Sequence, residues 1–158
     1  MPDRTSPTAG PGAGPPPGRL PFQYATLRVV PDVERGERLN AGVVLLCRPA
    51  RFLEARIELD EPLLAALAPG MDLQPIRRIL ALVPRVCAGE PDAGPIASLE
   101  PAERFHWVVA PSSTVVQASA VHTGLTDDPA ATLAWLVRRL VRRPAADHPD
   151  HDPGPSLT

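Results

Sequence analysis

The chain has 158 residues, and its 16 basic and 18 acidic residues give a formal net charge of −2. A chain of this length favours a single domain. A charge so close to neutral provides no strongly basic field, which argues against a dedicated nucleic-acid binder. Every basic residue is arginine, a bias that indicates the codon usage of a GC-rich bacterial genome.

The two ends of the chain differ in composition from its middle. Residues 1–21 hold seven prolines and four glycines, and residues 144–158 hold four prolines with three aspartates and two histidines. Neither stretch has enough large apolar side chains to offset the entropy of ordering it. We therefore expect disordered tails at both ends and a single domain over residues 22–143, which is long enough for one hydrophobic core.

Neither a targeting segment nor a membrane span is predicted. The N-terminus lacks the apolar stretch of a signal peptide, and no run approaches the ~20 apolar residues that cross a bilayer. Cys47 and Cys87 both lie in apolar runs, which favours buried free thiols over a disulfide. These features predict a cytoplasmic protein.

The first part of the domain is predicted to form strands. Two β-rich runs, Tyr24–Val30 and Leu39–Cys47, enclose the charged segment Asp32–Arg38, which predicts an antiparallel pair with a polar connection at one end of a sheet. The second run is almost continuously apolar, so we expect that strand to be covered on both faces. Gly42 inside it indicates a bulge or a close backbone approach. Residues 52–59 alternate with period two and predict a third strand with one solvent-facing side.

Two helices are predicted next. Asp60 is expected to cap a short helix that Pro69-Gly70 ends. Asp72 is expected to cap a second helix, in which the apolar residues recur with helical spacing. Pro84 should end or kink this helix near Val83, and residues 88–97 are expected to form a loop.

The last part of the domain mixes predicted strands and helices. We expect one helical turn from Ser98 to Arg104, strands at Phe105–Ala110 and Thr114–Ala118, and irregular structure over 121–126. The final helix is predicted to begin at Asp127 or Asp128. Its apolar stripe has i, i+3, i+4, i+7, i+8 spacing and consists of Leu133, Leu136, Val137, Leu140 and Val141.

This order of elements favours an α+β domain. Strands come first, then helices, then strands and a last helix. We therefore expect an antiparallel sheet of about five strands with helices packed on it.

The charged segment is the first candidate functional surface. Glu34 and Glu37 could act as an acid–base couple or as ligands of a hard metal ion, and Arg35 and Arg38 could clamp an anion. The alternative is a solvated hairpin end in which neighbouring charges neutralise one another and Asn40 bonds the backbone. Equal numbers of acids and bases rarely make a strong site for either partner, which favours the alternative.

Two further segments contain candidate residues. Arg104 could be an anion ligand and His106 a general base, although in the expected strand they would simply form the outward face opposite Phe105 and Trp107. His122 precedes a glycine in a segment with no obvious packing role and could border a site. We hypothesise that Glu37, Arg104 and His122 form a composite site if they fold onto one another.

Other polar residues are better explained by structural roles. The hydroxyls of 112–114 lack a nucleophile-elbow motif and are expected to bond the local backbone. Arginines 138, 139, 142 and 143 form a basic edge on the last helix, where they favour the helix dipole. No phosphate loop, dinucleotide fingerprint or zinc spacing is present, so no cofactor and no metal is predicted.

One extended pattern resembles a known family. The pattern is Tyr24-x-x-x-Arg28-x-x-Pro31-x-x-x-Arg35-Gly36-Glu37-x-x-Asn40-x-Gly42-Val43-Val44, followed by Arg104-Phe105-x-Trp107 and His122-Thr123-Gly124. It resembles a bacterial family called domain of unknown function 3037, over about Phe22 to Arg143. The resemblance implies no established reaction. It does imply a partner protein, because members of this family often neighbour the gene of a HipA-like kinase.

Two functions of different kinds follow from these patterns. The first is a non-enzymatic accessory or protein-interaction domain, with a HipA-like kinase as a candidate partner. The alternative is an enzyme or a nucleotide- or phosphate-binding protein with a composite Glu/Arg/His site, so whether the protein is an enzyme stays open. The candidate functional surface consists of Arg35, Glu37, Asn40, Arg104 and His122. Nucleic-acid binding through the arginines of the last helix is the least favoured function.

Overall fold

The computed structural model describes residues 18–145 and 154–158. The elements follow one another as β1 (Leu20–Val29), β2 (Leu39–Cys47), β3 (Phe52–Ile57), α1 (Glu61–Leu67), α2 (Gln74–Ala88), a 3-10 turn η1 (Pro95–Ser98), α3 (Pro101–Val109), β4 (Val116–Ala118), β5 (His122–Thr126), α4 (Pro129–Leu140) and β6 (Ser156–Leu157). The predicted α+β class with an antiparallel sheet is confirmed, with six strands in place of about five.

β1 is the central strand of the sheet. The strand order is β3-β2-β1-β5-β6, and β4 also pairs with β1. The start of β1 pairs with β5 and its end with β4, so these two short strands share one edge of β1. Between them, Thr26 N donates to Ser119 Oγ at 2.9 Å, and Ser119 N donates to Thr26 O at 2.8 Å. The edge of β1 is thereby kept hydrogen-bonded where neither strand pairs with it.

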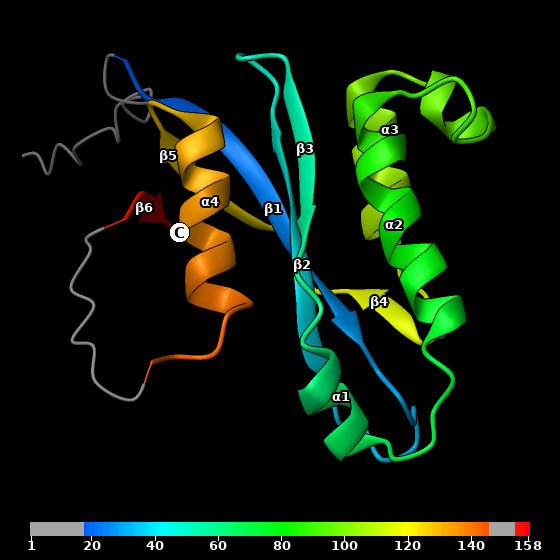
Figure 1. Ribbon diagram of the computed structural model, residues 1–158. Helices are drawn as coiled ribbons and strands as arrows, with labels where there is room; N and C mark the ends of the chain where they lie inside the picture. The colour runs from blue at the N-terminus through cyan, green and yellow to red at the C-terminus, as the bar shows by residue number, and fades with distance from the viewer. Residues whose placement is uncertain (1–17, 146–153) are drawn as a thin grey trace, which may run out of the picture.

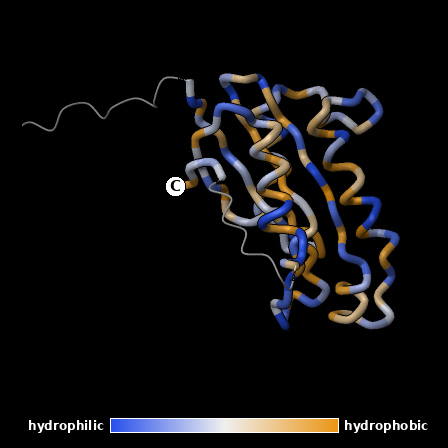
Figure 2. Tube along the Cα trace, turned by 60° about the vertical axis from the view of Figure 1, so that its left-hand side comes forward, coloured by the Kyte–Doolittle hydropathy of each residue, from blue (hydrophilic) through white to orange (hydrophobic). Residues whose placement is uncertain are grey.

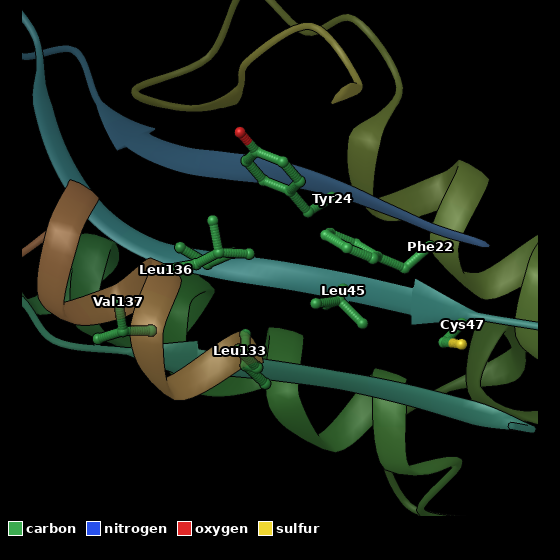
Figure 3. Close-up of a cluster of buried hydrophobic side chains, with 8 residues drawn as sticks. Phe22, Tyr24, Leu45, Cys47, Leu133, Leu136 and Val137 are labelled. Atoms are coloured by element: carbon green, nitrogen blue, oxygen red, sulfur yellow. The ribbon is translucent and has the colours of Figure 1, made fainter. Parts of the chain in front are cut away.

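The sheet lies between two helical layers (Figure 1). On one face, Leu133, Leu136 and Val137 of α4 pack with side chains of β1 and β2, including Phe22 and Leu45 (Figure 3). On the other face, α2 and α3 cover the alternate residues of the same strands. Figure 2 shows polar and apolar positions alternating along the outer helices, as expected for helices that bury one side only.

β2 is buried on both faces, as its apolar run predicts. Every residue from Ala41 to Cys47 is buried. The expectation for Gly42 is also confirmed, since a Cβ there would lie 2.6 Å from the carbonyl oxygen of Arg56. The register against β1 shifts between Leu27 and Arg28, whose partners are Gly42 and Asn40, which makes Ala41 the extra residue of a bulge.

Two of the three predicted aspartate caps are formed, at α1 and α4, and the cap predicted at Asp72 is not. Asp60 Oδ1 accepts from Leu63 N at 3.0 Å, and Asp128 Oδ1 accepts from Ala131 N at 3.0 Å. Each oxygen satisfies a backbone donor that the first helical turn leaves free. Asp72 instead binds the N–H of Gln74, and the cap position of α2 is Leu73.

The prediction that Pro84 ends or kinks α2 near Val83 is wrong as to the end of the helix. α2 continues to Ala88 and ends where Gly89 takes a left-handed conformation, with φ of 71°. Val86 and Cys87, beyond the proline, are both buried. Packing of these side chains stabilises the last turn despite the hydrogen bond that proline removes.

The predicted strand at Phe105–Ala110 is wrong, because these residues belong almost entirely to helix α3. Glu100 and Glu103 form a capping box, and Pro101 occupies the first helical turn, two start signals that outweigh the β propensity of the following residues. Phe105 is fully buried, whereas Trp107 is 50 % exposed. Arg104 and His106 therefore do not share the outer face of a strand.

The segment expected to be irregular, 121–126, contains strand β5. Its residues pair with β1 from Leu20↔Thr126 to Tyr24↔His122. The strand forms because β1 offers unpaired backbone groups along this edge, which the sequence of β5 itself does not reveal.

The chain ends depart in part from the expected tail boundaries. β1 already begins at Leu20, and Ser156–Leu157 pairs with β5. The rest of the expected tails, 1–17 and 146–153, lies outside the described residues. The described part of the chain contains no helix that is long and apolar enough to cross a bilayer. Cys47 and Cys87 are buried free thiols, as predicted.

Candidate functional site

The charged segment forms the connection between β1 and β2, as predicted. Asp32 Oδ1 accepts from the backbone N–H groups of Glu34 and Arg35 at 2.9 and 3.2 Å. Gly36 has a φ of 73°, and its N–H donates to the carbonyl oxygen of Asp32 at 3.0 Å. Asp32 and the left-handed glycine thus shape the turn.

Arg35 and Glu37 form a two-point ion pair at the surface. Arg35 Nε donates to Glu37 Oε2 at 3.1 Å, and Nη2 donates to Oε1 at 2.7 Å. The hydrogen bond from Arg35 lowers the pKa of the Glu37 carboxyl, and the same bond raises the pKa of Arg35. A carboxylate held ionised in this way is poorly matched to general base catalysis near neutral pH.

An open hollow of about 350 Å³ lies between this connection and the turn after α1. Asp32, Arg35 and Glu37 line one side, and residues 67–71 line the other. Apolar side chains are exposed beside these charges, since Val33 is 56 % exposed and Leu67 is 38 % exposed. We refer to this feature as the loop-end hollow.

Asn40 bonds a backbone group, as the hairpin interpretation expects, but a distant one. Its Nδ2 donates to the carbonyl oxygen of Leu140 at 2.8 Å, which joins the start of β2 to the end of α4. The last carbonyls of a helix lack partners within the helix. The first role of Asn40 is therefore to cap α4.

Arg104 closes the end of another helix. Its Nη1 donates to the carbonyl oxygens of Val86 and Cys87, at 3.2 and 2.6 Å, in the last turn of α2. Its Nε is buried without a partner among the described residues. This contact depends on the packing of α3 against α2, so no local sequence pattern predicts it.

His122 lies on β5 directly opposite Tyr24 of β1. The two rings stack, with centroids 5.2 Å apart and an angle of 28° between their planes. Tyr24 belongs to the cluster that packs on α4, and Figure 3 shows its hydroxyl directed away from the aliphatic side chains of that cluster. Burial raises the pKa of the Tyr24 phenol.

The structure does not bring Glu37, Arg104 and His122 together. Arg104 binds α2 on one face of the sheet, whereas His122 stacks on Tyr24 on the α4 face. Glu37 lies in the connection beyond the far end of β1. The predicted residues therefore occupy separate places: Arg35 and Glu37 at the loop-end hollow, Asn40 and His122 on the α4 face, and Arg104 beneath the opposite face.

The side chains of the other polar segments form local hydrogen bonds or ion pairs. Ser112 Oγ and Thr114 Oγ1 lie 2.6 Å apart, and Thr114 Oγ1 donates to the carbonyl oxygen of Val116. Beyond the last helix, Arg142 pairs with Glu58 and Arg143 with Asp60. Within residues 18–145 and 154–158, no group of three or more His, Cys, Asp or Glu side chains could hold a metal ion.

Arg28 is the residue whose environment the sequence interpretation missed. It lies on β1 between Asn40 of β2 and Gln117 of β4, and its Nε is buried without a hydrogen-bond partner in the described structure. Burial, and then the positive charge of Arg38, lower the pKa of its guanidinium. One signal was available: a lone arginine within the apolar run of a predicted strand.

The fold and these sites define a single α+β domain with a charged hollow at one end of the sheet and an arginine-bearing polar patch on the α4 face. The residues of the recognised pattern, from Tyr24 through Arg28 and Asn40 to His122, contribute to that patch. The chain belongs to the family of proteins of unknown function DUF3037, whose model matches residues 24–141. No curated protein and no solved structure matches the chain.

Proposed function

We propose that this protein is a cytoplasmic accessory domain that binds a partner protein through the loop-end hollow. The observation that supports the proposal is the combination of exposed apolar side chains with a fixed ion pair around one concavity. Leu67 in the lining of the hollow and Val33 in the adjoining connection provide exposed apolar surface, and the two-point pair of Arg35 with Glu37 provides oriented charge.

This combination suits protein recognition. Interfaces concentrate their binding energy in a few apolar or arginine anchors at a concave centre, with polar groups around them. Because Arg35 is already held by Glu37, less side-chain entropy is lost when a partner binds. The backbone of the turn is also fixed by Asp32 and Gly36.

The candidate partner is a HipA-like kinase. The support for this choice is the gene neighbourhood that membership of the family implies. A domain encoded beside such a kinase and carrying a preformed concave surface is suited to be its accessory subunit.

The experiment is co-expression of the full chain with a HipA-like kinase, followed by co-purification and calorimetric titration. We expect a complex at micromolar concentrations. The double variant Val33→Ser with Leu67→Ser should weaken it at least tenfold. The matched control, Val121→Ser with Leu99→Ser, removes side chains of similar exposure elsewhere and should bind normally.

A charge-swapped variant separates recognition from folding. Arg35→Glu combined with Glu37→Arg keeps an ion pair and reverses its polarity. It should fold with unchanged stability and lose the complex. Absence of a complex with the intact chain, or equal losses in the two double variants, would contradict the proposal.

The alternative function, an enzyme or nucleotide-binding protein with a composite Glu/Arg/His site, has less support. Arg104 is engaged by the end of α2, and Glu37 by Arg35. A thermal-shift screen of the intact chain with nucleotides and divalent metals tests this alternative, because a ligand of the folded state raises the melting temperature. A ligand-induced rise in melting temperature would support the composite site if each of the variants Glu37→Gln, Arg104→Met and His122→Ala abolished it.

A further inference from the structure

We propose that the α4 face of the sheet carries an anion site in which Arg28 and Arg38 bind the phosphate group of a small molecule. The site is separate from the loop-end hollow and does not involve Glu37 or Arg104. It rests on the position of Arg28 in the sheet, on the lack of acidic partners of both arginines and on the buried Nε of Arg28.

Strand geometry places Arg28 on the α4 face of the sheet. Side chains two residues apart on a strand point the same way, so Arg28 shares the face of Tyr24, which packs with α4. Asn40 is directly opposite Arg28 on β2, and its side chain reaches the end of α4. Arg38 directly precedes β2, two residues before Asn40, and its charge acts on the guanidinium of Arg28.

Neither arginine has an acidic partner in the described structure. Six other arginines of the described structure form ion pairs with carboxylates, namely Arg35, Arg56, Arg77, Arg85, Arg142 and Arg143. Arg28 instead has a buried Nε without an acceptor, and burial, followed by the like charge of Arg38, lowers the pKa of its guanidinium. A buried donor without a partner and a pair of like charges both destabilise a folded chain.

An anion would relieve both costs at once. It would accept from the Nε of Arg28 and separate the two positive charges. Guanidinium groups match the geometry of phosphate oxygens through paired N–H donors. Asn40 uses one amide hydrogen for Leu140 and has a second one available.

The same face offers a stacking surface farther along β1. His122 is exposed and stacks on Tyr24, four residues from Arg28, which corresponds to about 13 Å along a strand. A phosphate that carries a flat ring could therefore contact His122 as well. This distinguishes a nucleotide from inorganic phosphate as the source of the anion.

The test uses calorimetric titration of the full chain with inorganic phosphate and with adenosine monophosphate, at an ionic strength held constant with sodium chloride. We expect saturable binding of phosphate. Arg38→Gln should weaken it about tenfold, which corresponds to about 1.4 kcal/mol. The control Arg78→Gln removes an exposed arginine of α2 and should leave the affinity unchanged.

Arg28→Met provides a second, independent readout. It replaces the guanidinium with an apolar side chain of similar length, so the variant should lose phosphate binding and unfold at an equal or higher urea concentration than the parent when phosphate is absent. Tighter binding of adenosine monophosphate than of phosphate, lost in His122→Ala, would identify a nucleotide. Equal binding of both would indicate the phosphate group alone, and either result supports the site.

Two results would overturn the proposal. One is that a titration with sodium chloride alone gives the same heat signal as the titration with phosphate, because the signal would then reflect general screening of the two arginines. The other is unchanged phosphate affinity in both Arg28→Met and Arg38→Gln.

Discussion

The amide of Asn40 donates to the carbonyl oxygen of Leu140 at 2.8 Å, across 100 positions of the sequence. Asn40 is the only asparagine in the chain. The bond fixes the first residues of β2 to the last turn of α4 and sets where that helix stops above the sheet.

Asn40→Ala should lower the free energy of unfolding by about 1 kcal/mol, the usual contribution of one such hydrogen bond. Asn40→Asp should cost more, because a carboxylate would face a carbonyl oxygen. Urea unfolding at neutral pH measures both values. Gln117→Ala removes a local bond to Thr114 and is expected to change little; equal losses at the two positions would contradict the capping role.

Arg104→Met should destabilise the protein by about 2 kcal/mol, because the charged donor to two carbonyls of α2 is lost. Arg104→Lys should recover only part of this loss, since an ammonium group cannot reproduce the planar guanidinium. Urea unfolding measures both variants, and hydrogen exchange should show the loss concentrated in the last turn of α2. Full stability of Arg104→Met would show that the contact contributes nothing.

Stability should depend on pH through Glu58. Two hydrogen bonds from Arg142 lower the pKa of the Glu58 carboxyl from its ordinary value of 4.5. A lowered pKa in the folded state contributes stability above the unfolded pKa, and this contribution is lost as the pH falls through the folded pKa. Glu58→Gln should therefore be less stable than the parent at neutral pH and converge with it well below pH 4.5.

The matched control for this prediction is Glu54→Gln. Glu54 pairs with Arg56 within the same strand, so its loss leaves β3 still linked to the end of α4. Its effect on the urea midpoint should be smaller than that of Glu58→Gln. A difference between parent and Glu58→Gln that persists undiminished in acid would contradict the assignment.

The Cys87 thiol should be unreactive in the folded protein. Burial raises its pKa to about 12, so almost no thiolate is present at neutral pH, and the thiolate is the nucleophile. In a Cys47→Ser background, which leaves Cys87 as the single thiol, Ellman's reagent should react only as fast as the protein unfolds. Rapid reaction without denaturant would show that the site opens locally.

Pro84→Ala should raise the stability of the protein. Pro84 lies inside α2, where proline lacks the N–H of the helical ladder and is unfavourable by up to about 3 kcal/mol relative to alanine. We expect a gain of about 1 kcal/mol, reduced by local relaxation of the helix, in urea unfolding. A loss of stability would show that the ring itself packs productively against its surroundings.

The sequence alone determined the elements whose signals are local and strong. The apolar run of β2, the charged connection after β1 and the start of α4 at Asp127 or Asp128 were all predicted from composition, periodicity and capping residues, and the cap is Asp128. Pattern recognition over the same residues also indicated the family, which the match over residues 24–141 confirms. In these segments local preference and tertiary packing favour the same conformation.

Only the tertiary structure decided the rest. Residues 105–110 are helical despite their β propensity because the capping box at Glu100 starts a helix before them. β5 forms because it pairs with an edge of β1. The roles of Asn40 and Arg104 depend on carbonyl groups of helices distant in sequence. Arg28 lies opposite Asn40 because a bulge in β2 shifts the register between the two strands. Such long-range hydrogen bonds and register shifts depend on how elements pack, and no local pattern of residues encodes them.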